Sequence, residues 1–375
     1  MKARDATLLC ILCALGAMLS CTGGTSPAVL PKPEPAPPTL SQIGTHVLPE
    51  TRRVEVDAQI VVSDLPAKAK RVQIWVPFPA GSRAQAVLEP IIESPAAYRP
   101  IIRLDANYDS PSIFLIVDEP LQGKAEGSVV PLPKEVRLRY TVQVERRRIN
   151  DAERKPGDPD SIGTKTLRKE FAADLKLPTT PKADEAAAAL EADALSAALA
   201  AVPAAADNTP LARARAIYDH VVATFEPDNA PAARPLKEVL ESKRGNALDY
   251  AQATVALMRA AGIPARIESG LALPEDRTAE AVELKDRGAW VSFYANGSGW
   301  TSCDPYLADR FGELKDYLFA GLDANRVGMS VGPAPALMPP PDSGVPLVLN
   351  DVIAEADGKP IPATMTLTFR DVCPK

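Results

Sequence analysis

RGNALDYAQATVALMRAAGIPARIESG, residues 244–270, joins a glycine-containing turn to an apolar helix and then to a strand. Ala251, Val255 and Met258 recur at helical spacing and predict one buried helix face. Gly262 suits the left-handed position that often follows a helix C-terminus. The next residues, PARIESGLAL, predict a strand. The sequence therefore predicts a turn, a buried helix and a strand, in this order, at the centre of the fold.

Further elements are predicted on both sides of this centre. Downstream, AWVSFY and GWTSCDP predict two strands, which ANGSG joins as a hairpin loop. Upstream, residues 208–225 predict a helix that Asn208 or Thr209 caps and Pro210 begins. The Ala-rich segment 183–202 predicts a connecting helix of high propensity but little buried area. The apolar side chains that share one face of the 208–225 helix are Leu211, Ala214, Tyr218, Val221 and Phe225.

From Arg52 to Arg148 the apolar residues follow a period of two. RVEVDAQIVV and VRLRYTVQVE alternate clearly, and RVQIWVPFP and SIFLIVDE lie between them. Short alternating strands separated by Pro, Gly and Asp turns predict an antiparallel β-sandwich. Near the C-terminus, residues 346–369 predict a hairpin with Asp357 and Gly358 in its turn.

The composition excludes several classes of protein. The chain has 375 residues, of which 46% are hydrophobic and 24% are charged, as in ordinary globular proteins of two or three domains. The net charge of −6 and the absence of a basic block argue against nucleic-acid binding. There is no Cys/His cluster and no recognisable calcium loop, so we predict neither a metal nor any other cofactor.

The N-terminus predicts export. Lys2 and Arg4 precede a short apolar run, and MLSC places Cys21 after a small residue. This pattern resembles the lipobox of bacterial lipoproteins, although Met18 stands where Leu is usual. The resemblance implies cleavage before Cys21 and a lipid anchor in the membrane, whereas the alternative is an ordinary secretory signal. Thr22, rather than Asp, implies the outer membrane, with the protein facing the periplasm.

Two cysteines remain beyond the signal and the lipidation site. Cys303 and Cys373 form a disulfide if they lie close together in an oxidising compartment. Otherwise they are buried free thiols. The sequence leaves both possibilities open.

The order of motifs resembles the bacterial transglutaminase-like superfamily, which has a papain-type arrangement. That family has G-x-C-x-D at the start of a helix, then R-A-x-G-I-P-A-R, an H-A-W strand and G-W-x-x-x-D-P. This chain reads GNALD from Gly245, RAAGIPAR, Gly288-Ala289-Trp290, and GWTSCDP with Asp304. WVPFP, VRLRYTVQV and DYLFAGLDANRVGMSVG also resemble family segments, so the likeness extends over roughly residues 50–370.

The resemblance implies an α+β fold, with an N-terminal antiparallel β-sandwich followed by a transglutaminase-like domain. We expect a lipoprotein signal peptide at 1–20, a Pro-rich tether at 21–48, the β-sandwich domain at 49–150, a linker with the Ala-rich helix at 151–207, the transglutaminase-like domain at 208–335 and a C-terminal β-hairpin extension at 336–375.

Transferred to this sequence, the catalytic triad is incomplete. The nucleophile position holds Ala247 and the base position holds Gly288, and only Asp304 matches. A thiol enzyme needs a thiolate and a base. Cys303 is next to Asp304, but neighbouring strand residues face opposite ways, so we expect it to point away from the site. The two histidines, His46 and His220, do not follow the family's order.

We therefore predict a catalytically inactive envelope protein that binds a peptide, a peptidoglycan fragment or a partner protein in the former cleft. Around that cleft we expect Asn246, Asp249, Trp290 and Trp300 to contribute to binding. Two alternatives remain: a protease or amidase with another nucleophile, and a structural envelope scaffold.

Lipidation of Cys21 can be tested directly. Cys21→Ala should move the protein from the detergent phase to the aqueous phase, because removing the thiol removes the attachment point of the lipid. Partitioning in a detergent that separates into two phases measures this. A Cys21→Ala variant that still partitions into detergent would contradict the lipoprotein assignment.

Overall fold

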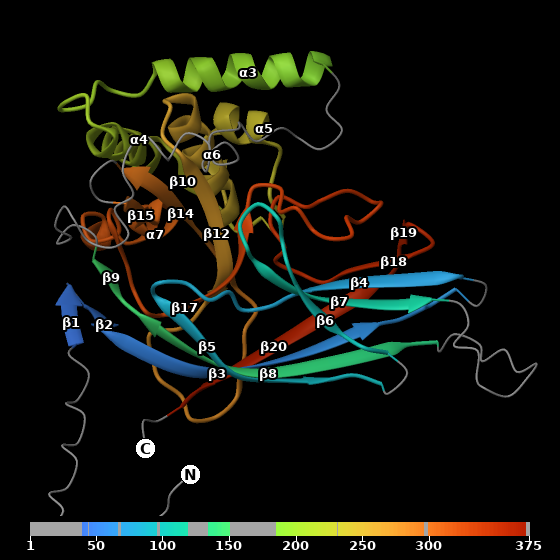
Figure 1. Ribbon diagram of the computed structural model, residues 1–375. Coiled ribbons are helices and arrows are strands. Elements are labelled where there is room, and N and C mark those ends of the chain that lie inside the picture. The colour runs from blue at the N-terminus through green and yellow to red at the C-terminus, as the bar shows by residue number, and fades with distance from the viewer. Residues whose placement is uncertain are drawn as a thin grey trace, which may run out of the picture. The chain divides into compact units, whose positions relative to one another are not determined.

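The computed structural model describes residues 40–43, 45–66, 69–95, 98–118, 134–150, 185–230, 232–295 and 299–372. Two five-stranded sheets and a four-stranded sheet covered by helices make up most of this part of the chain (Figure 1). The predicted α+β class is confirmed. The predicted signal peptide, Cys21 and Cys373 lie outside the described residues. None of the described helices is long and apolar enough to cross a lipid bilayer.

The first two sheets form the predicted antiparallel sandwich. One has the order β13 (Val282–Glu283), β20 (Ala363–Asp371), β3 (Thr51–Val62), β8 (Val136–Arg147), β5 (Gln85–Glu93). The other has the order β19 (Lys359–Pro360), β18 (Ile353–Ala356), β4 (Arg71–Pro77), β7 (Pro111–Asp118), β6 (Ile101–Leu104). Every second residue of β3 is buried, from Arg52 to Val62. From Val54 onward these residues join a core that includes Val72 and Ile74 of β4.

The C-terminal segment contributes to this sandwich. β18 and β19 form the predicted hairpin, and Asp357 (φ 48°) and Gly358 (φ 76°) occupy its two-residue turn. The strand β20 then pairs with β3 from Ala363 to Asp371. The segment predicted as a hairpin extension therefore also supplies an inner strand of the N-terminal sheet.

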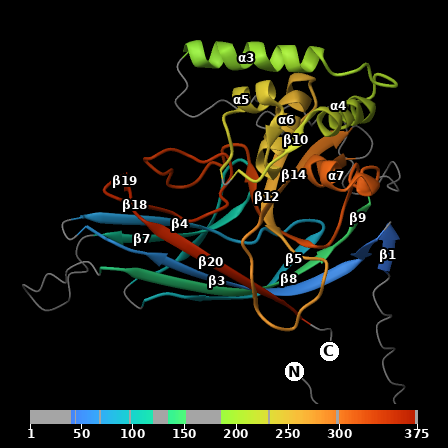
Figure 2. The same cartoon turned by 180° about the vertical axis from the view of Figure 1, so that it is seen from behind.

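The third sheet has the order β15 (Gly299–Cys303), β14 (Arg287–Ala295), β12 (Ala265–Ala272), β17 (Arg326–Gly332). The helix α6 (Ala247–Ala260) packs on β12 and β14. Around it lie α3 (Glu185–Ala200), α4 (Pro210–Thr224), α5 (Leu236–Ser242) and α7 (Pro305–Arg310), which is followed by the 3₁₀ turn η2 (Gly312–Leu314). Figure 2 shows this group from behind, with α3 lying across α5 and α6.

Helix boundaries follow the capping residues in the sequence. Thr209 caps α4 by accepting a hydrogen bond from the amide of Ala212, and Pro210 begins the helix, as predicted. Gly262 (φ 76°) follows α6, and the amide of Ile263 donates to the carbonyl of Met258. This is the bonding of a Schellman C-terminus, which turns the chain directly into β12.

Short strand pairs complete the described structure. β10 (Glu226–Pro227) pairs with β11 (Arg244–Gly245), and β9 (Ile149–Asn150) pairs with β16 (Gly321–Leu322). β1 (Leu40–Ile43) and β2 (His46–Pro49) form a hairpin inside the region predicted as a tether. Leu48 is buried in the core of the helical region, so this hairpin packs on that core.

Two buried polar side chains connect the sandwich to the third sheet and its loops. Arg52 of β3 pairs with Asp371 and donates to the side chain of Asn325 (2.9 Å) and to the carbonyl of Pro274. Gln85 exchanges two hydrogen bonds with the backbone of Gly328 in β17. The loops that follow β12 and precede β17 are therefore held from the sandwich side.

Removing the buried Arg52 should destabilise the protein strongly. Arg52→Leu leaves the carboxylate of Asp371 buried without its partner, which typically costs ~3–5 kcal/mol of unfolding free energy. The neighbouring Arg53 pairs with Glu145 but has 42% of its side chain exposed. Arg53→Leu should therefore cost less than ~1 kcal/mol. Urea unfolding measures both variants, and equal losses would contradict this account.

Candidate functional site

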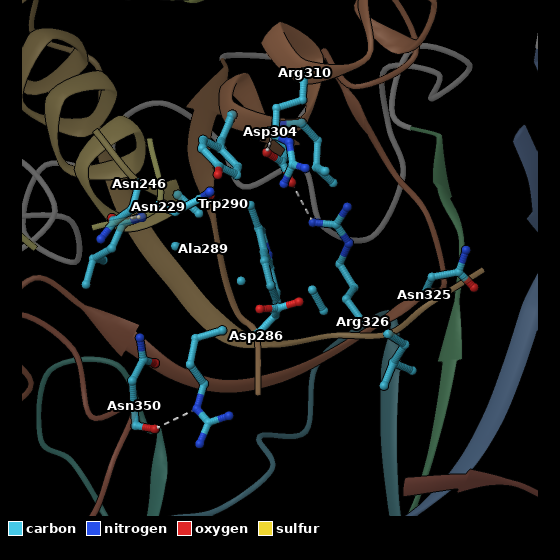
Figure 3. Close-up of a pocket in the computed structure, with 18 of the residues that line it drawn as sticks. Asn229, Asn246, Asp286, Ala289, Trp290, Asp304, Arg310, Asn325, Arg326 and Asn350 are labelled. Carbon is cyan, nitrogen blue, oxygen red and sulfur yellow. Dashed lines mark hydrogen bonds and ion pairs between the residues drawn. The ribbon is translucent and has the colours of Figure 1, made fainter. Parts of the chain in front are cut away.

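A cavity of about 870 Å³ lies beside the N-terminus of α6 (Figure 3). Its walls come from the turn before α6, from the first residues of β14, from the end of β12, and from α7 with the segment behind it. The cavity brings together five of the residues singled out in the sequence. They are Asn246, Ala247, Gly288, Trp290 and Asp304.

Ala247 is the first residue of α6, and the preceding turn holds it in place. Asn246 accepts hydrogen bonds from the amides of Leu248 and Asp249, and Asp249 accepts one from the amide of Asn246. Gly245 is required here, because a Cβ atom at this position would lie 2.3 Å from Cβ of Asp249. The helix dipole would favour a thiolate at position 247. Alanine offers no nucleophile.

Asp249 lies beneath the site rather than in it. Its side chain is fully buried and accepts hydrogen bonds from the amide (2.8 Å) and the guanidinium (3.2 Å) of Arg234. Burial raises the pKa of Asp249, although the hydrogen bonds from Arg234 and Asn246 act in the opposite direction. Asp249 does not line the cavity, so its role is to hold the turn before α6.

Gly288 lies on β14, where the sequence predicted the base position. A Cβ atom there would lie 3.4 Å from Cζ3 of Trp290 and 3.6 Å from Cβ of Ala272, which are ordinary contacts. The position therefore has room for a side chain. The imidazole is missing because of the sequence and not because the backbone excludes it.

Asp304 has both carboxylate oxygens engaged. One accepts from the amide of Leu307 (2.9 Å) and caps α7, and the other accepts from Arg326 (2.9 Å). Arg326 also pairs with Asp323. All three residues are buried. Burial raises the pKa of Asp304, while the positive charge of Arg326 acts to lower it. The remaining acid of the triad is thus bound to a guanidinium group.

Trp290 forms part of the cavity wall and is held on several sides. Its indole N–H donates to Glu268 (2.7 Å). The guanidinium groups of Arg326 and Arg146 lie 4.8 Å and 5.4 Å from its ring centroid. Burial, with the nearby charge of Arg326, lowers the pKa of Arg146 to about 10. Trp290 is 1% exposed, so it presents only a small surface to the cavity.

The other residues considered from the sequence lie elsewhere. Trp300 does not line the cavity and packs its ring against Arg266, whose guanidinium carbon is 3.9 Å from the ring centroid. Cys303 is a free thiol in the core beneath the sheet, and burial raises its pKa well above the ordinary value. His220 is buried on α4. His46 lies on β2 beside Glu275 and Phe311, which do line the cavity.

Comparison with known proteins agrees with this geometry. Residues 197–305 match the family model described as Transglutaminase-like superfamily. These residues therefore form a transglutaminase-like domain. No curated protein matches the chain.

One solved structure extends the likeness in fold beyond the transglutaminase-like domain. A candidate cysteine protease from Cytophaga hutchinsonii is 12% identical, with a TM-score of 0.52, over 87% of this chain and 92% of that one. At this identity the match shows a shared fold. The periplasmic domain of TgpA from Pseudomonas aeruginosa, solved with ethylmercury, is 17% identical over 64% of this chain and 91% of that one, with a TM-score of 0.29.

Sequence reasoning missed the groups that now surround Asp304. Arg326 and Asp323 lie in DYLFAGLDANRVGMSVG, a segment noted for its likeness to the transglutaminase-like family but not for any single residue. The available signal was a charged residue, Arg326, directly before an apolar run at the start of a strand. In the described ranges no three His, Cys, Asp or Glu side chains are grouped so that they could hold a metal ion.

A thiol introduced at position 247 should report whether the helix N-terminus still activates it. Ala247→Cys should give a thiol pKa below the free value of about 8.5, because the helix dipole favours the thiolate. Ala261, at the other end of α6, is also partly buried and packs on the same core. Ala261→Cys should give a pKa at or above about 8.5.

Peptide-resolved mass spectrometry of iodoacetamide labelling against pH measures both pKa values without interference from the native cysteines. Equal pKa values for the two introduced thiols would mean that the geometry of the nucleophile position has been lost.

Proposed function

We propose that this transglutaminase-like protein is a pseudoenzyme whose former catalytic cleft binds an extended peptide at the cell envelope. The observation that carries this proposal is the cavity of about 870 Å³ lined by Ala247, Gly288 and an Asp304 that is paired with Arg326. The helix and strands that would carry a catalytic thiol and imidazole are present, but the two side chains at those positions are those of Ala247 and Gly288.

The argument against thiol catalysis rests on each member of the triad. Ala247 offers no nucleophile and Gly288 offers no base. Asp304 is held by Arg326, so it is not available to orient an imidazole. The thiol of Cys303 is buried in the core between the helices and the sheet, and Cys303 does not line the cavity. A relocated cysteine nucleophile therefore has no support.

A free strand edge favours an extended peptide as the ligand. Four consecutive residues of β14, from Arg287 to Trp290, line the cavity. Successive side chains of a strand point to opposite faces of the sheet, so a cavity on one face would be lined by every second residue. Consecutive lining residues therefore indicate that the edge of the strand faces the cavity. β15 pairs with β14 only from Val291 onward, and at Asp304 the chain leaves the sheet. Within the described residues, the edge before Val291 is open for β-strand addition.

The side chains around this edge also suit a peptide. Apolar groups of Leu273, Leu307 and Phe311 line the walls. Arg310 lies 5.6 Å from the ring centroid of Tyr306, and no carboxylate in the described part of the chain pairs with it. Apolar walls with a few charged groups are typical of ligand pockets. A peptide carboxylate is a suitable partner for Arg310.

The envelope location is part of the same proposal. The lipobox-like sequence before Cys21 and the Pro-rich segment after it support a lipid-anchored protein that faces the periplasm from the outer membrane. In that position the available peptides are segments of exported proteins and the peptide part of peptidoglycan. A purely structural scaffold would need no open cleft.

A binding experiment with a matched pair of variants tests the proposal. The immobilised protein is first exposed to a pool of extended peptides and soluble peptidoglycan fragments. The ligands that it retains are then labelled, and their affinity for the protein in solution is measured by fluorescence anisotropy. Ala247→Phe should weaken binding at least tenfold, about 1.4 kcal/mol, because the new ring occupies the cavity. Ala261→Phe, at the opposite end of α6, should leave the affinity unchanged.

The same samples are assayed for turnover. Native protein and Cys303→Ala should both show background hydrolysis and transamidation, with no effect of iodoacetamide. Equal binding by Ala247→Phe and native protein, at equal thermal stability, would contradict the cleft as the binding site. Iodoacetamide-sensitive turnover that Cys303→Ala abolishes would contradict the pseudoenzyme.

A further inference from the structure

His46 bridges two carboxylates from separate parts of the chain. Its Nδ1 lies 2.5 Å from Oε1 of Glu275, and its Nε2 lies 3.2 Å from Oε1 of Glu313. The ring also packs edge-on against Phe311, with 5.0 Å between the ring centroids. Only 11% of the His46 side chain is exposed.

The two contacts determine the protonation state of the ring. An ionised carboxylate only accepts hydrogen bonds, and a neutral imidazole has a single N–H to donate. With a carboxylate oxygen facing each nitrogen, both contacts are hydrogen bonds only when both nitrogens carry protons. The arrangement is therefore that of an imidazolium ion between Glu275 and Glu313. Loss of one proton turns one attractive contact into a repulsive one between a lone pair and a carboxylate.

The two carboxylates belong to different walls of the cavity. Glu275 itself lines the cavity, in the loop after β12 with Leu273 and Pro274. Glu313 belongs to η2, and the nearby residues Phe311 and Leu314 also line the cavity. The first wall is anchored to the sandwich, because Arg52 donates to the carbonyl of Pro274. His46 contacts a carboxylate from each of the two segments and so links them.

We propose that His46 is a pH-sensitive latch between two segments that line the cavity. Protonated, it joins the loop at 273–276 to the segment at 311–314. Deprotonated, it keeps one carboxylate and releases the other, so the two walls are no longer tied together.

The electrostatic surroundings keep His46 protonated to a higher pH than an ordinary histidine. The hydrogen bond to Glu275 is the largest influence and raises the pKa of His46. Burial acts in the opposite direction, and Glu313 adds to the increase. Glu275 and Glu313 are the charged groups that act on the ring from the described elements packed against it. β2 carries no other titratable group, and the residue opposite on β1 is Ile43.

The direction of the pH effect follows from this shift. A histidine whose pKa is raised on folding contributes its full stabilisation below the unfolded value of about 6.5. That contribution disappears as the pH rises through the folded pKa. The latch is thus closed below pH 6.5 and opens as the pH rises through the folded pKa of His46. If the latch controls access of a ligand to the cleft, that effect rests on the peptide-binding function proposed above. The existence of the latch does not depend on that function.

The chain provides its own control, because it has only two histidines. His220 has no carboxylate partner among the described hydrogen bonds, and burial lowers its pKa. The full chain labelled with ¹³C at histidine Cε1 should give two titration curves, which His46→Gln assigns. His46 should titrate above pH 6.5 and His220 below it. Glu313→Gln should shift the His46 curve downward and leave the His220 curve in place.

Hydrogen exchange then tests, without any ligand, whether His46 holds the segment at 311–314. After correction for intrinsic exchange rates, amides at 311–314 should lose protection as the pH rises through the measured pKa of His46. His46→Gln should remove this pH dependence, and His220→Gln should retain it. A His46 pKa at or below 6.5, or the same pH dependence in His46→Gln, would overturn the latch. Neither result bears on peptide binding, so failure of the latch and failure of the proposed function are distinguishable.

Discussion

The buried ion pair between Asp304 and Arg326 is the constraint on which the site depends. Asp304 lies where β15 ends and α7 begins, and Arg326 is the first residue of β17. Their bond therefore joins the two edge strands of the third sheet at the floor of the cavity. Asp323 shares the same guanidinium. The three charged side chains stabilise one another, because removing one of them leaves a buried charge without its partner.

This ion pair also changes what the site can do. In a working triad the carboxylate orients an imidazole, and its negative charge stabilises the imidazolium that forms. Here Arg326 already neutralises Asp304, and the Leu307 amide occupies the other oxygen. Restoring a thiol and an imidazole would not restore the triad, because the acid is engaged elsewhere. In the pseudoenzyme proposed above, three positions of the cleft therefore oppose thiol catalysis, and not only the missing nucleophile.

Local features of the fold were predictable from the sequence, and features that depend on distant partners were not. Thr209, Pro210 and Gly262 mark helix ends through bonds to residues a few positions away, so their roles could be predicted from sequence alone. The pairing of β20 with β3 joins opposite ends of the chain, and no local pattern specifies it. Trp300 also depends on a partner that its local sequence does not specify. Its motif predicted a residue beside the cleft, and in the structure its ring packs on Arg266.

The small residues at the centre of the cleft favour the proposed binding module over a passive scaffold. A scaffold gains stability when apolar side chains fill a hollow beside its core, since each buried methylene contributes about 0.8 kcal/mol. At Gly288 a Cβ atom would meet only ordinary contacts, so the backbone does not require glycine there. Instead the cavity stays open, with a free strand edge along one side. One of its walls is anchored by Arg52 and the other is joined to it through His46. An open cleft with one fixed wall and one wall on a titratable link suits a protein that admits and retains a ligand.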